Sequence, residues 1–119
     1  MKLNQEIIDG ALIVTVPVDA LDGSNDHQLR AQLFALIQDH RNLILDLNQV
    51  QFIDSTGCGV MLAALKQLRA VGGDLKLCCI TRAVRALFDL IGIRSVMGVF
   101  DTREEALEAF AEPLPTENV

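Results

Sequence analysis

Hydrophobic and polar positions follow two different periods along this chain, and the switches between them outline the expected elements. Short aliphatic or β-branched runs predict strands near residues 3–8, 11–18, 43–47, 75–80 and 96–100. Between these runs, apolar residues recur at the spacing of amphipathic helices near residues 26–40, 55–68, 82–91 and 103–110. The expected order is two strands followed by an alternation of helix and strand that ends in a helix.

This order of elements predicts the fold class. Asp9 and Gly10 form a two-residue hairpin signal between the first two strands, whereas strands separated by a helix must cross over and lie parallel. We therefore expect an α/β fold with a mixed β-sheet, an antiparallel N-terminal edge hairpin and four helices packed mainly on one face. The chain of 119 residues is long enough for one domain, expected over 1–111, and the polar C-terminal tail 112–119 is expected to be disordered.

Local signals mark the ends of the later helices. Thr81 is the expected N-cap of the third helix and Gly92 its end, while Thr102 and Glu105 form a capping box that opens the last helix. The buried stripe expected for the third helix consists of Val84, Leu87, Phe88 and Ile91.

Composition and charge exclude several classes of function. Half of the residues are apolar, which is typical of one compact domain. The formal charge of -6 argues against a nucleic-acid surface, which needs clustered Lys and Arg. No apolar tract reaches the roughly 18 residues of a membrane span. The first residues also lack the apolar core of a secretory signal, so we expect a cytoplasmic protein.

The three cysteines show no paired metal-ligand spacing. Cys78 and Cys79 are adjacent on an expected strand and should point to opposite faces, which discourages joint ligation. Buried free thiols are the simplest interpretation, and we expect no metal and no cofactor. Cys58 differs because it lies in the first turn of a helix, where the pKa of a thiol can be lowered; a redox role stays open.

A polar turn, Asp54-Ser55-Thr56-Gly57-Cys58-Gly59, opens the second helix directly after a short apolar patch at 50–53. At this junction backbone N–H groups lack intrahelical partners and the helix dipole is positive, so the position favours an anion. A phosphate on Ser55 would add roughly two negative charges there. The simpler alternative is that Ser55 is only the N-cap of its helix.

Other kinds of chemistry fit this turn poorly. Asp22 and Asp54 could converge at one end of the sheet, but carboxylates in such loops more often cap and hydrogen-bond, so we treat both as partner-contact candidates. Gly57 and Gly59 lack the third glycine of a dinucleotide loop, and no Walker lysine follows. Ser55 has no candidate base held by a third group, which a nucleophile requires. The chain is therefore expected not to be an enzyme.

The order of elements, together with the segments Leu45-Asp46-Leu47 and Phe52-Ile53-Asp54-Ser55-Thr56-Gly57, resembles the STAS domain and in particular the bacterial anti-sigma factor antagonists. The resemblance runs from about Leu3 to Phe110. It implies a STAS-like sheet and a motif serine that is phosphorylated by a partner acting as both serine-protein kinase and anti-sigma factor. The unphosphorylated form would bind this partner, phosphorylation would release it, and a PP2C-like phosphatase would reverse the modification.

Carried over by position, Ser55 resembles the phosphoacceptor of the family, Asp54 the acidic residue before it, and Asp22 the acidic residue of the neighbouring loop. Thr56 is a secondary acceptor. Two positions depart from the family, since Asp19 stands where many members have glycine and Cys58 where an aliphatic residue is usual. The partner-binding residues implied by the resemblance are Asp22, Ser24, Asp54, Ser55, Thr56, Gly57 and Cys58.

Two further functions stay open from the sequence. The chain could be an accessory subunit that docks on the ATPase of an ABC transporter without a phosphorylation switch, or it could bind a nucleotide or phosphometabolite at the helix entry. For a protein partner, the expected docking patch lies at the start of the second helix around Cys58 and Met61. Met61, Leu65 and Leu68 fit the core stripe of this helix, so Met61 is equally well interpreted as a buried residue, and Lys66 points away from the stripe.

Overall fold

The computed structural model describes residues 1–111, so the expected disorder of 112–119 lies outside the described residues. A five-stranded sheet has the order β1-β2-β4-β6-β7, with bounds Asn4–Ile8, Ala11–Thr15, Asn42–Asp46, Asp74–Cys78 and Gly98–Phe100. A second, two-stranded sheet pairs β3 (Ala20–Leu21) with β5 (Phe52–Ile53). The helices are α1 (Asp26–Leu36), α2 (Ser55–Ala70), α3 (Arg82–Ile91), α4 (Arg103–Ala111) and a 3-10 turn, η1 (Ile93–Ser95).

The first two strands form the expected edge hairpin. β1 and β2 pair antiparallel, and the residues between them, Asp9 and Gly10, have φ of 52° and 83°. Two positive φ values in succession are typical of the type I′ turn, one of the two common two-residue hairpin turns. The β2–β4, β4–β6 and β6–β7 pairs are parallel. The predicted α/β fold with a mixed sheet and an antiparallel edge is confirmed.

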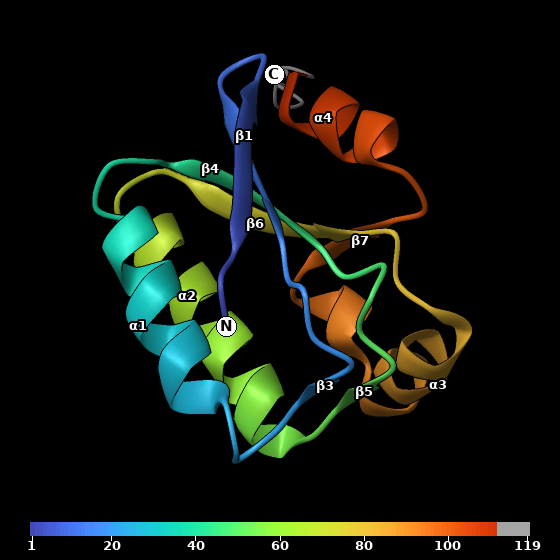
Figure 1. Ribbon diagram of the computed structural model, residues 1–119. Helices are drawn as coiled ribbons and strands as arrows, with labels where there is room; N and C mark the ends of the chain where they lie inside the picture. The colour runs from blue at the N-terminus through green and yellow to red at the C-terminus, as the bar shows by residue number, and fades with distance from the viewer. Residues whose placement is uncertain (112–119) are drawn as a thin grey trace.

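The helices cover the sheet unequally (Figure 1). α1, α2 and α3 contribute to one large core that contains Leu33, Met61 and Phe88 and packs on alternate residues of the strands. α4 covers the opposite face, where Ala106 packs with Ile13 and Ile44 in a smaller core. Three of the four helices therefore lie on one face, as expected. No helix within residues 1–111 combines the length and the apolar content that a membrane crossing requires.

The predicted helix ends of the C-terminal half are confirmed. The Thr81 hydroxyl accepts the Val84 amide at 3.3 Å, and Gly92 closes α3 in the left-handed conformation with φ of 72°. Thr102 and Glu105 cap each other reciprocally, with the Glu105 amide 3.1 Å from the Thr102 hydroxyl and the Thr102 amide 3.2 Å from the Glu105 carboxylate. These ends depend on local hydrogen bonds, which is why residue type alone predicts them.

Two expectations about these elements are wrong. α1 ends at Leu36, although its pattern predicted helix to residue 40. Only Val84 and Phe88 of α3 are buried; Leu87 is half-buried and Ile91 is 51 % exposed. The apolar stripe of α3 therefore extends past the sheet that it covers. One further element was not predicted: Phe52 and Ile53, in the apolar patch at 50–53, pair with Ala20 and Leu21 as a short parallel ladder.

The side-chain arrangement of the two adjacent cysteines also differs from the expectation. β6 ends at Cys78, and Cys79 has φ of 62°, a left-handed conformation outside the strand. The usual alternation of side chains across a strand does not apply to a residue in this conformation. One sulfur from each cysteine and one carboxylate oxygen of Asp46 lie within 4.8 Å of one another.

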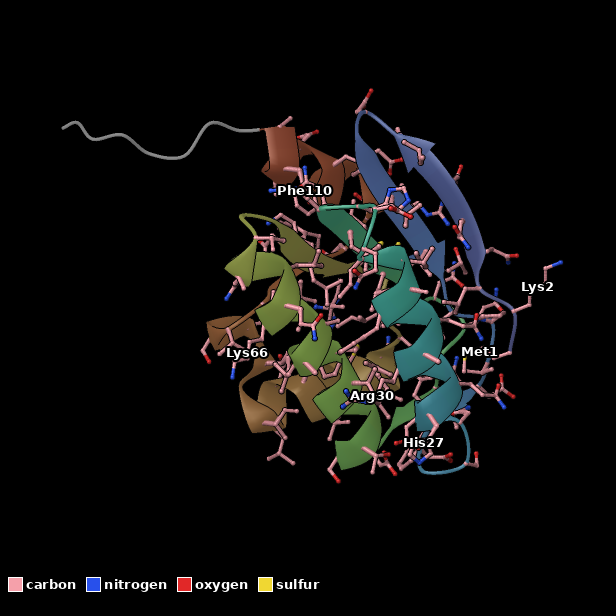
Figure 2. All side chains as sticks on the ribbon, turned by 90° about the vertical axis from the view of Figure 1, so that its left-hand side faces the viewer. Met1, Lys2, His27, Arg30, Lys66 and Phe110 are labelled. Carbon is pink, nitrogen blue, oxygen red and sulfur yellow. The ribbon has the colours of Figure 1, made fainter. Side chains whose placement is uncertain are left out.

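Arg103 fixes α4 to the sheet. Its Nε donates to Asp46 Oδ2 at 2.7 Å, its Nη2 donates to the Thr15 hydroxyl at 2.9 Å, and its Nη1 pairs with Glu6. The Asp46 hydrogen bond is the main cause that raises the pKa of Arg103, followed by the Glu6 hydrogen bond, and burial opposes both. Near the other end of α4, the Lys76 ammonium lies 4.5 Å from the ring centroid of Phe110, which Figure 2 labels. These contacts anchor both ends of the helix.

Candidate functional site

Asp54, and not Ser55, is the N-cap of α2. Its backbone is extended, with φ of -97° and ψ of -174°, and its Oδ1 accepts the amides of Thr56 at 2.9 Å and Gly57 at 3.0 Å. The Thr56 hydroxyl donates to the same oxygen at 2.6 Å. Ser55 is the first residue of the helix. The alternative in which Ser55 serves as the N-cap is therefore wrong.

The cap changes what the helix entry offers to an anion. The Asp54 carboxylate accepts hydrogen bonds from the amides of Thr56 and Gly57, and the Asp54 carbonyl accepts one from the Cys58 amide at 3.0 Å, so these three amides are not free to bind an anion. The hydrogen bond from the Thr56 hydroxyl and then that from the Gly57 amide lower the pKa of Asp54. The expectation of free amides that welcome a phosphate is therefore wrong. A negative charge already stands at the positive end of the helix dipole.

Ser55 is exposed at this entry, and no group of residues 1–111 hydrogen-bonds its hydroxyl. Thr56 is also exposed, but its hydroxyl is held by Asp54. Of the two adjacent hydroxyls, that of Ser55 is the one that another molecule can reach without breaking a contact of the cap.

A neighbouring loop lies against the helix entry. The Asp54 amide donates to the Leu21 carbonyl at 3.0 Å, next to the β3–β5 ladder. Beyond Leu21, Asp22 Oδ1 accepts the amide of Ser24 at 2.9 Å and its hydroxyl at 2.6 Å. A hydrogen bond from the Gly23 amide is among the causes that lower the pKa of Asp54. The structure thus brings together the Asp22 and Asp54 loops, and both carboxylates cap their own loops.

Gly57 sits where the two segments touch. A Cβ atom at this position would lie 2.9 Å from Ile53 Cγ2, 2.9 Å from the Leu21 carbonyl oxygen and 3.0 Å from Leu21 Cβ. Only a residue without a Cβ fits there. Gly59 lies on the exposed side of the helix, and an added Cβ there would meet nothing within 4 Å. Of these two glycines, Gly57 is the one that close packing requires.

The exposed docking patch expected around Cys58 is wrong, and of the two interpretations of Met61 the buried one is confirmed. Met61 is fully buried and Cys58 is 8 % exposed, because both belong to the inward stripe of α2. Burial raises the pKa of the Cys58 thiol, and the Asp54 carboxylate raises it further, so the lowered pKa expected from the helix position is not found. On the outward side of the same helix, Lys66 points to solvent as expected (Figure 2).

An apolar cleft takes the place of that patch. It lies between the first turns of α2 and the last turns of α3 and has a volume of about 300 Å³. Leu62 and Ile91, which are 38 % and 51 % exposed, form its apolar sides. Leu62 is apolar but off the core stripe of α2, a signal that could have predicted this surface. The complete lining is Ile53, Asp54, Ser55, Cys58, Gly59, Leu62, Leu87 and Ile91.

Comparisons with known proteins agree on one family. The family model described as the STAS domain matches residues 2–106. A protein of Bordetella bronchiseptica named as an anti-sigma factor antagonist, BtrV, is 39% identical over 97% of this chain and 99% of its own length. The anti-sigma F factor antagonist of Paenibacillus polymyxa is 30% identical over 90% of this chain and 92% of its own. The solved structure of the anti-sigma factor antagonist SpoIIAA in its unphosphorylated form superposes with a TM-score of 0.74 at 25% identity, covering 92% of this chain and 96% of that one.

Proposed function

This chain belongs to the STAS domain family, among the anti-sigma factor antagonists, and we propose that phosphorylation of Ser55 switches its binding. It is a regulatory binding protein and not an enzyme. In our proposal the unphosphorylated protein binds a serine-protein kinase that is also an anti-sigma factor, in the cytoplasm. Phosphorylation of Ser55 releases this partner, and a PP2C-like phosphatase restores binding.

The observation that carries the proposal is an exposed, uncommitted hydroxyl beside an apolar cleft. A kinase needs the acceptor oxygen in reach of its active site, and Ser55 meets this requirement better than Thr56, whose hydroxyl is held by Asp54. A stable protein complex also needs apolar surface to bury. The cleft lined by Leu62 and Ile91 supplies such surface at the edge of the acceptor. SpoIIAA, an anti-sigma factor antagonist with this fold, has been solved in an unphosphorylated and in a phosphorylated form, which supports the proposal of a phosphorylation switch here.

The charges around Ser55 support release rather than capture. A phosphoserine adds about two negative charges at neutral pH. The adjacent Asp54 is ionised and already uses the helix amides, and no salt bridge within residues 1–111 includes Asp54 or Asp22. A phosphate at this position would therefore meet like charge from its own chain. In a closely docked complex, the bulk and the desolvation of the phosphate would cost several kcal/mol, which is about a hundredfold or more in affinity.

The remaining partner-contact candidates have separate roles in this proposal. Asp54 and Gly57 hold the acceptor at the surface, the first through the cap and the second by allowing close packing on Leu21. Asp22 and Ser24 shape the adjoining loop, where we propose that the partner makes polar contacts. Cys58 contributes only through the small exposed part of its side chain, which lines the cleft.

The test compares Ser55→Ala and Ser55→Asp in binding to the partner kinase by titration calorimetry, with Ser95→Ala as the control. Ser95 is also exposed, but it lies outside the proposed partner contacts and its hydroxyl donates to the Gly92 carbonyl at 2.8 Å. We expect wild type, Ser55→Ala and Ser95→Ala to bind, and Ser55→Asp to bind at least about tenfold more weakly. Incubation with the kinase and ATP should add one phosphate to wild type and to Ser95→Ala, but none to Ser55→Ala, as measured by intact mass. Equal binding by both Ser55 variants would contradict the switch and would favour docking on a transporter ATPase instead.

A further inference from the structure

A second cluster of reactive side chains lies far from Ser55, on the α4 side of the sheet. It consists of Asp46 at the end of β4, Cys78 at the end of β6, and Cys79 directly after it. Asp46 and Cys78 are buried, whereas Cys79 is partly exposed. We propose that these residues form a binding site for a thiophilic divalent cation, with Zn²⁺ as its best-fitting ion, through two thiolates and one carboxylate oxygen.

The geometry already gathers the ligand atoms. One sulfur from each cysteine and one oxygen of Asp46 lie within 4.8 Å of one another, so small side-chain rotations would bring them to the separations of about 3.5–3.8 Å that the ligands of one tetrahedral Zn²⁺ ion have. Consecutive residues of a strand point to opposite faces. The positive φ of Cys79 turns its thiol back toward Cys78, and the Cys79 amide remains bonded to the Phe100 carbonyl at 3.1 Å. The pairing of these thiols is thus built into the backbone.

The left-handed conformation makes the identity of residue 79 informative. L-residues with a Cβ atom are disfavoured at φ near 60°, and glycine or asparagine usually occupies such positions. Here a cysteine stands in the place that glycine would take at lower strain. A thiol at this position therefore comes with a conformational cost, which ligation of an ion would offset.

The donor set selects the kind of ion. Thiolates favour Zn²⁺ and other soft or borderline ions over Mg²⁺ and Ca²⁺, and Zn²⁺ accepts mixed sulfur and oxygen ligands. Three protein ligands leave a fourth position, which water can fill from the exposed side of Cys79. On binding, each thiol transfers its proton to the solvent as its sulfur–metal bond forms. The two thiolates then balance the two charges of the ion.

Arg103 does not exclude a cation from this cluster. Because two thiolates neutralise the ion, the carboxylate of Asp46 can keep its pairing with the Arg103 guanidinium. Asp46 Oδ2 accepts Arg103 Nε at 2.7 Å, and Asp46 Oδ1 accepts the Asn48 amide at 3.0 Å. Each carboxylate oxygen has capacity for a further bond. These contacts orient the carboxylate as outer-shell partners orient metal ligands.

The test uses the reduced, tag-free protein, titrated with Zn²⁺ by calorimetry and with Co²⁺ as a spectroscopic probe. We expect one ion per chain and a sulfur-to-cobalt charge-transfer absorption. Cys79→Gly is the decisive variant, because glycine suits the left-handed backbone and the protein should remain folded. It should weaken Zn²⁺ binding by more than about 100-fold, the upper end of the loss caused by removing an outer-shell partner. Cys58→Ser, a buried thiol elsewhere in the fold, should leave the affinity unchanged.

Three results of this experiment would overturn the proposed metal site: no Zn²⁺ uptake by wild type, Co²⁺ uptake without the cobalt–sulfur absorption, or equal Zn²⁺ affinities of wild type and Cys79→Gly. Binding that is lost on changing His27 or His40, and not on changing Cys79, would identify an unrelated surface site. Because the cluster lies on the opposite face of the sheet from α2, its failure leaves the Ser55 switch untouched.

Discussion

Replacing each of the two glycines at the entry of α2 by alanine should change the stability of the protein in opposite directions: Gly57→Ala should destabilise it and Gly59→Ala should stabilise it. Gly57 and Gly59 lie two residues apart in the same helix, so Gly→Ala brings a similar gain in helix propensity at each, at most about 1 kcal/mol. They differ in surroundings. A Cβ at 57 would be 2.9 Å from the Leu21 carbonyl oxygen and 2.9 Å from Ile53 Cγ2, whereas a Cβ at 59 meets nothing within 4 Å.

The magnitude follows from how little these neighbours can move. Leu21 and Ile53 are essentially fully buried, and the Leu21 carbonyl accepts the Asp54 amide at 3.0 Å, so retreat of the carbonyl would weaken the β3–β5 connection. Overpacking of a rigid site costs up to about 3 kcal/mol. After subtraction of the propensity gain, Gly57→Ala should be destabilised by about 2 kcal/mol. Gly59→Ala should be stabilised by about 0.5–1 kcal/mol.

Urea unfolding followed by circular dichroism measures both free energies, and thermal unfolding gives a second reading. For a domain of this size, 1 kcal/mol corresponds to about 4 °C in Tm. We expect Tm to fall by about 8 °C in Gly57→Ala and to rise by about 3 °C in Gly59→Ala. Changes of the same sign in the two variants would refute the reasoning, because it depends on the contacts that a Cβ at position 57, but not at position 59, would make with Leu21 and Ile53.

Three further predictions concern the cap, the α4 anchor and the cleft. Hydrogen bonds lower the pKa of Asp54, so its carboxylate stabilises the fold at pH values above the ordinary carboxyl pKa, and this contribution is lost as the pH falls through the lowered pKa of the folded state. The difference in unfolding free energy between wild type and Asp54→Asn should therefore shrink over that acidic range. Arg103→Met leaves the carboxylate of Asp46, which is 1 % exposed, without its cation, and should lower the unfolding free energy in urea by about 2 kcal/mol. The loss should be smaller than that for breaking a fully buried ion pair, because water reaches the guanidinium. Adding Asp46→Asn to the same chain should recover part of the loss. Leu62→Glu should weaken partner binding by about 10–100-fold in calorimetry, whereas Ile7→Glu, at an exposed position of the edge strand, should not; equal losses would argue against the cleft as the docking surface.

The elements that sequence predicted well are those specified by their own residues. Asp9 and Gly10 adopt the hairpin turn, and Thr81 and Gly92 bound α3, because each effect depends on one residue type at one backbone geometry. The β3–β5 ladder was missed for the opposite reason. Two residues on each strand are too few to show a period, and the pairing joins segments about thirty positions apart, so only the assembled fold creates it.

For the candidate site, the sequence predicted the position of Ser55 at a helix entry but not the electrostatics around it. Ser55 lies exposed at the entry of α2 as the pattern indicated, yet the sequence gives no means to decide which of two neighbouring polar side chains caps the helix. Helical phase explains the other errors, since Cys58 faces the sheet and Ile91 extends beyond it. Cys79 escaped prediction because a cysteine with positive φ is rare and has no sequence signal.

The long-range pairing of Asp46 and Arg103 has a consequence for biosynthesis. The acid is placed at the centre of the sheet, but the base that compensates it follows 57 positions later, near the C-terminal end of the chain. During translation the emerging sheet therefore carries a carboxylate without its counterion, and one of its faces stays open to water. The domain therefore reaches its full stability only after the ribosome has released Arg103 and α4 can pack on the sheet.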